Sequence, residues 1–194
     1  PYIVGLVELA EGTRLLTNIV HCPPELVKIG MDLELVFDDT DPELILPMFR
    51  PAQPVRNTVT RRFEDVAVGE ELPLWPIDVS TRLVVGGAIA TRDYFAGHHD
   101  KDAALALGSP HVFMNILTTN GLVQRFVESW AGGPGAPLRD LKIKLGAPNY
   151  PGDSMTFSGS VTDKRDSDRS VEVTLKGKNG FGNHVTGTVR VCLA

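Results

Sequence analysis

The sequence predicts an α+β fold in which an antiparallel sheet encloses one long, buried helix. Residues 109–130, SPHVFMNILTTNGLVQRFVESW, are apolar at helical spacing on most sides, and a helix of that kind is buried. Four segments follow at about 139–147, 153–163, 169–178 and 183–193. Their alternation of apolar and polar residues is typical of strands that bury one face.

The segments before the long helix complete this pattern. LPLWPIDVS predicts a strand, and Ser80 can cap a helix from about Thr81 to Tyr94. Asp100 is expected to cap a second, short helix, KDAALAL, which ends before Gly108. One strand, a helix, a long buried helix and four antiparallel strands make up the arrangement called the hotdog fold.

The first fifty residues predict strands and turns instead. YIVGLVEL and TRLLTNIV form two expected strands, and a third places Leu33, Leu35 and Phe37 on one face. DDTDPELILPMF is expected to form a loop and a short edge piece. Because so few strands rarely make a stable domain, a partner or a preceding segment should complete the sheet. The start at Pro1, without Met, fits a truncated or processed chain.

A linker is expected between these two regions. RPAQPVRNTVTRR contains two prolines and four arginines and shows no apolar periodicity. The expected organisation is therefore a β unit at residues 1–52, a linker at 53–62 and the hotdog unit at 63–194.

The composition excludes several classes of protein. A net charge of −5 and an isoelectric point near 5.5 argue against nucleic-acid binding, which usually needs a basic face. No apolar run reaches the roughly 18 residues of a transmembrane helix, so no membrane association is expected. Two cysteines, Cys22 and Cys192, predict no disulfide framework, and a cytoplasmic location is the simpler expectation.

Residues 90–109, ATRDYFAGHHDKDAALALGS, concentrate titratable side chains between two apolar stretches. A proton-transfer site, a metal site and an exposed polar loop are competing interpretations. Asp93 and His98, separated by a loop with Gly97, can fold beside one another and share one water as a general acid–base pair. The spacing permits this pair without requiring it, and a solvated loop remains the alternative.

A metal site in this segment would use His98, His99, Asp100 and Asp102. Adjacent histidine side chains diverge, whereas a metal ion needs convergent ligands. We therefore expect no metal here, a solvated His99, and Asp100 in the role of a helix cap.

Other polar residues lie on buried elements. Asn115 and Asn120 fall on the predicted long helix, where an unpaired amide costs about 1–3 kcal/mol. They are candidates for a substrate pocket or a subunit interface, and the interface is the favoured prediction. His184 is expected on the surface of a strand.

Four blocks of sequence resemble a known family. ATRDYFAGHHDKDAALALGS, FMNILTTNGLVQRFVESWAG, LGAPNYPGDSMTFSGSV and GNHVTGTV, in this order, resemble the MaoC-like hotdog hydratases, the (R)-specific enoyl-CoA hydratase class. Within that class they are similar to the small catalytic subunit of bacterial steroid side-chain hydratases. The class carries Asp-x-Asn-Pro-x-His, and DYFAGH keeps both ends of that motif while Phe95 and Ala96 replace Asn-Pro.

The resemblance implies addition of water to a 2-enoyl-CoA, with Asp93 and His98 holding the water. Backbone N–H groups of Phe113 and Met114, where common members have His-Gly, would bind the enolate oxygen of the thioester. Coenzyme A would be part of the substrate, and no other cofactor is implied. Hotdog thioesterases usually carry a carboxylate on the central helix, and residues 111–127 contain none, which disfavours that activity.

The resemblance also implies partners. A single hotdog unit exposes a sheet edge, so a second MaoC-like subunit or a second copy of the chain is expected to cover it. PYIVGLVELAEGTRLLTNIV, IGMDLELVF and LPMFRPA resemble the C-terminal part of OB-fold, acyl-CoA-associated proteins encoded beside thiolases, without their usual zinc ribbon and first strand. Residues 1–52 would then dock a thiolase-like aldolase that cleaves the hydroxyacyl-CoA product. The alternative function is a non-catalytic scaffold or activating subunit of that aldolase complex.

Overall fold

The computed structural model describes residues 2–41 and 44–194. The chain divides into two compact units, Pro1–Gln53 and Pro54–Ala194. Of the expected linker, residues 53–62, only Gln53 falls in the first unit, and residues 54–62 belong to the second. There the backbone N–H groups of Asn57 and Arg61 donate to carbonyl oxygens of Ser129 and Ala131, at 3.0 and 2.9 Å.

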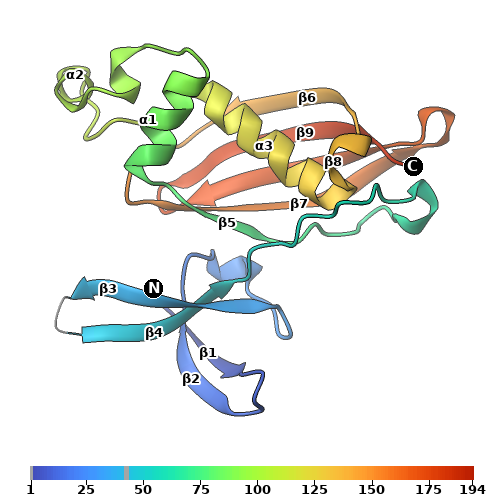
Figure 1. Cartoon of the computed structure of the whole chain (residues 1–194), viewed down its shortest axis with the longest axis horizontal. Helices are drawn as coiled ribbons and strands as arrows, with labels where there is room; N and C mark the ends of the chain where they lie inside the picture. Colours follow the sequence, from blue (N-terminus) through green and yellow to red (C-terminus); the bar gives the residue numbers. More distant parts are fainter. Residues whose placement is uncertain (1, 42–43) are drawn as a thin grey trace. The chain divides into compact units, whose positions relative to one another are not determined.

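The first unit is a four-stranded sheet in the order β1-β2-β4-β3 (Figure 1). Its elements are β1 (Ile3–Glu8), β2 (Arg14–Ile19), a 3-10 helix (Pro24–Leu26), β3 (Leu33–Asp41) and β4 (Leu44–Pro51). β1 pairs with β2 and β3 pairs with β4 in antiparallel fashion, whereas β2 and β4 run parallel and pair at Ile19 and Phe49. Val7, Ile19 and Phe49 form its small buried core.

The described residues of the segment DDTDPELILPMF form strands rather than the expected loop and short edge piece. β3 continues to Asp41 and β4 begins at Leu44, with residues 42 and 43 outside the described part of the chain. Pairing of Asp38 with Leu46 extends the antiparallel ladder into this segment. Pairing with a neighbouring strand here outweighs the weak strand propensity of aspartate.

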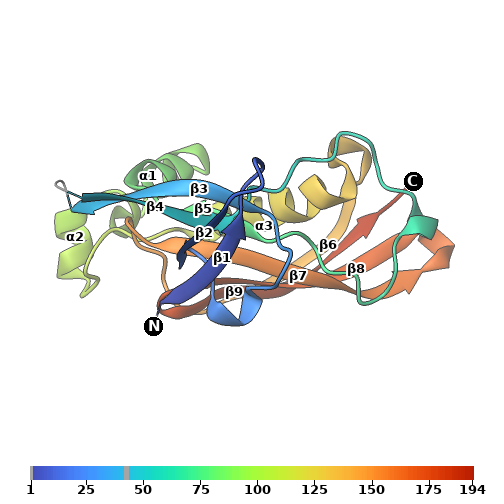
Figure 2. The same cartoon turned by 90° about the horizontal axis from the view of Figure 1, so that it is seen from below.

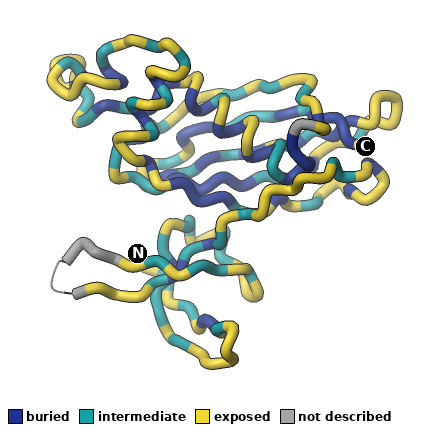
Figure 3. Tube along the Cα trace, in the orientation of Figure 1, coloured by how far each residue is buried: buried dark blue, intermediate teal, exposed yellow. Residues whose placement is uncertain are grey.

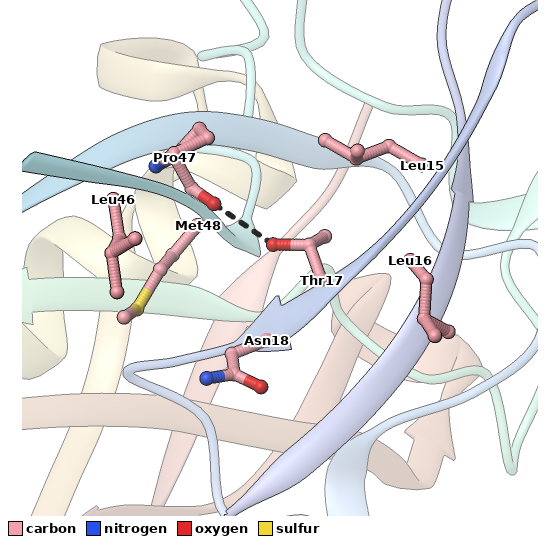
Figure 4. A pocket seen from close by; sticks show the side chains of 7 residues that line it. All are labelled: Leu15, Leu16, Thr17, Asn18, Leu46, Pro47 and Met48. Atoms are coloured by element: carbon pink, nitrogen blue, oxygen red, sulfur yellow. Dashed lines mark hydrogen bonds between the residues drawn. The ribbon is translucent and has the colours of Figure 1, made fainter.

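A groove opens where β2 and β4 diverge (Figure 4). The Thr17 hydroxyl donates to the Pro47 carbonyl oxygen at 2.9 Å and bridges the two strands. The groove has a volume of about 310 Å³ and is lined by Leu15, Leu16, Thr17, Asn18, Leu46, Pro47 and Met48. None of these side chains can donate or accept a proton near neutral pH, so the groove lacks acid–base chemistry.

The second unit is a five-stranded antiparallel sheet in the order β5-β7-β8-β9-β6, with helices on one face (Figures 1 and 2). Its strands are β5 (Trp75–Asp78), β6 (Leu138–Leu145), β7 (Ser154–Arg165), β8 (Ser170–Asn179) and β9 (Gly182–Cys192). Its α-helices are α1 (Thr81–Ala90), α2 (Lys101–Ala106) and α3 (Ile116–Ala131). This is the expected hotdog arrangement, and the four C-terminal strands lie where the alternation predicted them.

α3 lies along the sheet and contributes one face to the core (Figures 1 and 3). Its buried residues are Thr118, Thr119, Leu122, Val123, Phe126, Val127, Trp130 and Ala131. Phe126 of α3 stacks with Trp75 and Phe157 of the sheet, and the three ring centroids lie 5.4–6.4 Å apart. Each buried phenylalanine contributes on the order of 1.5–3 kcal/mol through its apolar area.

The expectation that this helix is buried on most sides is wrong for the single chain. Ile116 and Leu117, at its first turn, are 46% and 44% exposed. The sheet packs against only one face of α3, because this unit consists of one sheet with its helices on one side. Among the described residues, no helix is long and apolar enough to cross a membrane.

Candidate active site

The site begins at the end of α1. Ser80 caps this helix as expected, and its hydroxyl oxygen accepts the N–H of Leu83 at 3.1 Å. The helix ends at Ala90, however, four residues before the expected Tyr94. Its end is set by Arg92, a non-glycine residue in the left-handed region with φ of 57°.

Arg92 and Asp93 close α1 with a Schellman motif. The N–H of Arg92 donates to Ile89 O at 3.1 Å, and the N–H of Asp93 donates to Ala88 O at 2.9 Å. Glycine usually occupies the left-handed position of this motif. Because arginine stands there instead, the sequence gives no signal for the end of the helix. The motif places Asp93 directly after the last turn of α1.

Three neighbours surround the carboxylate of Asp93. Oδ1 accepts the N–H of Phe95 at 3.4 Å, Oδ2 accepts from Asn115 Nδ2 at 3.0 Å, and His98 Nε2 lies 3.4 Å from Oδ2. The Asn115 hydrogen bond, assisted by the Phe95 N–H and by His98, holds the pKa of Asp93 below its usual value, against partial desolvation. Asp93 is therefore ionised and keeps 26% of its side chain exposed.

His98 lies on a single 3-10 turn, Ala96–His98, and is buried. Its Nδ1 is 2.7 Å from the carbonyl oxygen of Phe113. Because a carbonyl oxygen only accepts, Nδ1 carries a hydrogen, and the neutral ring has its lone pair on Nε2. That lone pair faces Asp93.

Two phenylalanine rings hold the imidazole from its edges. Phe95 and Phe113 lie 5.3 and 4.9 Å from the His98 ring, in T-shaped contacts. A Cβ atom at Gly97 would lie 2.7 Å from the Phe95 ring and 3.0 Å from the Phe113 ring. Glycine at this position lets both rings approach, which fixes the orientation of His98.

The neighbouring polar residues point elsewhere. His99 is exposed, and its Nε2 lies 3.1 Å from the Tyr94 carbonyl oxygen. Asp100 caps α2 as expected, accepting the N–H groups of Asp102 and Ala103 at 3.0 Å each. In the described ranges, no three His, Cys, Asp or Glu side chains gather in a group that could hold a metal ion.

The placement expected for Phe113 and Met114 needs correction. Both residues precede α3, which begins at Ile116. The N–H of Phe113 already donates to Gly97 O at 3.2 Å, and the N–H of Met114 donates to Asn149 O at 3.0 Å. Neither N–H is available to an oxyanion in this conformation, because each is used to hold a neighbouring loop.

The two asparagines differ in their surroundings. Asn115 is 1% exposed, caps α3 and faces Asp93, so the favoured interface role does not fit it. The sequence offered no signal for this contact across 22 residues. Asn120 lies one turn further along α3, and its Oδ1 is buried without a hydrogen-bond partner among the described residues.

His184 is buried, contrary to the surface position expected for it. Its Nδ1 lies 2.7 Å from Ala147 O and its Nε2 lies 2.9 Å from the hydroxyl of Thr119 on α3. Desolvation lowers its pKa below the usual value, although the Ala147 carbonyl opposes this. His184 thus joins α3 to β9, outside the Asp93–His98 pair.

Known proteins share the second unit. The 3-oxo-4,17-pregnadiene-20-carboxyl-CoA hydratase beta subunit of Mycobacterium tuberculosis is 44% identical over 126 residues, which cover 65% of this chain and 95% of that protein. A solved MaoC-like dehydratase has a TM-score of 0.65 at 28% identity, over 72% of this chain and 44% of that one. The chain belongs to the MaoC-like hydratase family. The enzyme class expected from the sequence is thereby confirmed.

Solved structures extend the comparison for this MaoC-like hydratase. A chain in the crystal structure of the ChsH1-ChsH2 complex from Mycobacterium tuberculosis has a TM-score of 0.63 at 43% identity and covers 66% of this chain and 98% of that one. The (R)-hydratase from A. caviae has a TM-score of 0.62 at 19% identity, over 68% of this chain and 99% of that one. The second likeness shows the fold alone.

A family model and two further relatives match shorter stretches of this MaoC-like hydratase. Residues 1–38 match the family described as "ChsH2, C-terminal OB-fold domain". A probable enoyl-CoA hydratase alpha subunit of Thermomonospora curvata is 57% identical over 54 residues, which cover 28% of this chain and 17% of that protein. A DUF35 domain-containing scaffold protein of Methanothermobacter thermautotrophicus is 49% identical over 37 residues, 19% of this chain and 28% of that protein. The expected OB-fold resemblance is confirmed.

Proposed function

We propose that the hotdog unit hydrates the C2–C3 double bond of a 2-enoyl-CoA, with Asp93 and His98 activating the water. The observation that carries this proposal is the 3.4 Å separation of Asp93 Oδ2 and His98 Nε2. A carboxylate and an imidazole nitrogen at this distance can both hydrogen-bond to one water. The names of the hydratase relatives support the same reaction.

In the proposed reaction, the water oxygen forms a bond to C3 while the Asp93–His98 pair removes one of its protons. The electron pair of the double bond moves through C2 towards the thioester oxygen, and a proton is then delivered to C2 as the carbonyl reforms. Because the two groups are coupled, they act as one acid–base unit. General acid–base catalysis of this kind contributes roughly 100- to 10,000-fold in rate.

The enolate oxygen of the thioester requires hydrogen-bond donors. With the N–H groups of Phe113 and Met114 occupied, the candidates are those of Ile116 and Leu117, the first two residues of α3. N–H groups of a first helical turn lack an intrahelical acceptor, and the helix dipole favours negative charge there. This assignment moves the expected oxyanion site by three residues, to the true start of the helix.

The proposed substrate carries a bulky, apolar acyl group of the steroid side-chain type. Tyr94 and Phe95, next to the catalytic pair, are 69% and 49% exposed. Exposed aromatic surface beside a polar pair suits a large apolar group, whose burial removes both surfaces from water. The pregnadiene-carboxyl-CoA named for the 44% identical beta subunit supports this class.

A second MaoC-like subunit, or a second copy of the chain, is the proposed partner. β6 is an edge strand of eight residues, and no strand in the described part of the chain pairs with its outer side. The exposed Ile116 and Leu117 add apolar surface at the start of α3. Unpaired edges and apolar patches favour association. Asn120, with its unpaired amide oxygen, remains a candidate for this interface.

The OB-fold unit is proposed to dock a thiolase-like aldolase, which would consume the hydroxyacyl-CoA product. Two relatives are called DUF35 domain-containing scaffold proteins, and they are 49% and 51% identical to this chain over 37 residues. Their names support a docking role. They equally support the alternative function, in which the whole chain is a non-catalytic scaffold of the aldolase complex.

The deciding experiment is a hydration assay with a steroid enoyl-CoA, followed by loss of the conjugated enoyl-thioester absorbance. The chain is tested alone and with its candidate MaoC-like partner, as wild type, Asp93→Asn and His98→Ala. Both variants should lose about 100-fold or more in kcat. His99→Ala and Asp102→Asn, at exposed positions of the same segment, serve as matched controls and should stay within about twofold of wild type.

Three results separate the alternatives. Loss of activity only in the Asp93 and His98 variants supports the proposed site. Full activity of those variants rejects it. If wild type hydrates nothing, even with its partner, while it still binds an aldolase, the scaffold function replaces the hydratase proposal.

A further inference from the structure

A buried amide links the end of α1 to the start of α3. Asn115 Nδ2 lies 3.0 Å from Asp93 Oδ2 and 2.9 Å from the Thr91 hydroxyl, while Asn115 Oδ1 accepts the N–H of Thr118 at 2.9 Å. Both N–H donors of the amide and its oxygen are therefore used. At 1% exposure, Asn115 is shielded from the bulk solvent, and its hydrogen bonds depend on these partners.

The orientation of this amide follows from its neighbours. The backbone N–H of Thr118 can only donate, so the atom facing it must be the amide oxygen. The NH₂ group then faces Asp93 and Thr91. The Thr91 hydroxyl donates to Gly87 O at 2.8 Å, which leaves its oxygen free to accept from Asn115. Each donor in this hydrogen-bond network therefore meets an acceptor.

We propose that Asn115 is a positioning residue for Asp93, which it holds as an oriented carboxylate beside His98. The N-cap contact ties the amide to α3, so the carboxylate position is coupled to the start of that helix. A role for this coupling in hydration rests on the proposed function, whereas the effect on Asp93 itself does not. Besides Asn115, the Asp93 carboxylate faces the titratable side chain of His98 and accepts a hydrogen bond from the Phe95 N–H.

Two variants separate positioning from helix capping. Asn115→Ser keeps an oxygen able to cap α3 and loses the NH₂ group that faces Asp93. Asn115→Asp keeps the size and the cap but places a carboxylate beside Asp93. Ser80→Ala is the matched control, since it removes a helix cap from α1 without contact with Asp93.

The readout is the ¹³C titration of the Asp93 carboxyl group by NMR in the full chain without substrate, assigned with Asp93→Asn. In both Asn115 variants the pKa of Asp93 should shift upward, because the hydrogen bond that lowers it is lost. Ser80→Ala should leave it unchanged. An Asp93 titration that stays as in wild type in either folded Asn115 variant overturns the proposal.

A parallel assay distinguishes the two proposals. If wild type hydrates enoyl-CoA, Asn115→Ser should lose roughly 10- to 100-fold in kcat/KM, with its acid limb moved to higher pH, as expected for a lost hydrogen bond to a charged group. A shifted Asp93 titration with an inactive wild type supports positioning and rejects the hydratase function. An active wild type whose variants show an unshifted Asp93 titration supports the hydratase function and rejects the positioning role of Asn115.

Discussion

His98 Nδ1 lies 2.7 Å from the carbonyl oxygen of Phe113, and this contact decides which nitrogen of the ring can act on water. The carbonyl holds the hydrogen on Nδ1, so Nε2 is the unprotonated nitrogen of the neutral ring. The contact comes from a residue 15 positions along the chain, just before α3.

This contact predicts the Nδ1–H tautomer for neutral His98. Long-range ¹H–¹⁵N NMR spectra of the full chain distinguish the two tautomers by the nitrogen shifts of each ring, with His98→Ala to assign the signals. In its neutral form, His98 should show a protonated Nδ1 and an unprotonated Nε2. The opposite pattern would contradict the geometry on which the acid–base pair depends.

Arg92→Gly should stabilise the chain by about 0.5–1 kcal/mol. A non-glycine residue in the left-handed region costs roughly 1–2 kcal/mol, part of which glycine returns through its more flexible unfolded state. Urea unfolding measures the change. Arg82→Gly makes the same substitution inside α1 and should destabilise by about 1 kcal/mol. Destabilisation by Arg92→Gly would mean that the Arg92 side chain makes a contact that outweighs its backbone strain.

Adjacent glycines in α1 should respond in opposite directions to alanine. A Cβ atom at Gly87 would lie 2.2 Å from Thr118 Oγ1 and 3.1 Å from Thr118 Cβ, whereas Gly86 has open space. Gly87→Ala should destabilise by about 1–3 kcal/mol through overpacking between α1 and α3. Gly86→Ala should stabilise by about 0.5–1 kcal/mol through helix propensity. Chemical denaturation tests both, and equal effects would disprove the close approach of the two helices.

His184 should make stability depend on pH. Burial lowers its folded pKa below the usual 6.5, so the unfolded chain binds the proton more readily. The stability that the neutral ring contributes is present above about pH 6.5 and is lost progressively as pH falls towards the folded value. Urea unfolding between about pH 8 and pH 5 should show a steeper loss in wild type than in His184→Gln. His99→Gln, at an exposed position, is the control and should follow wild type.

Much of the fold follows from short-range patterns. Ser80 and Asp100 were predicted as helix caps, and both accept the backbone N–H groups that such caps accept. The C-terminal strands were predicted from alternation, because a strand with one buried face repeats every two residues. These features depend on neighbouring residues, so a single sequence contains the information that defines them.

Where the sequence-based prediction was wrong, the deciding contact came from a distant residue or an unusual backbone. α1 ends at Ala90 because Arg92 adopts a left-handed conformation, which an arginine in the sequence does not predict. α3 begins at Ile116 because Asn115 caps it, not at the apolar residues that precede it. Asp38 lies in a strand because Leu46 pairs with it.

The sequence by itself predicted the hotdog class, since periodicity and capping are local properties, and its resemblance to known families implied the OB-like first unit and the two residues proposed for catalysis. Only the tertiary structure decided which atoms meet. In it, Asn115 donates to Asp93, and the N–H groups of Phe113 and Met114 are already hydrogen-bonded. His184 is buried against Thr119 of α3. Hydrogen-bond partners of buried groups depend on how helices and loops pack, and packing brings together residues that no short-range pattern connects.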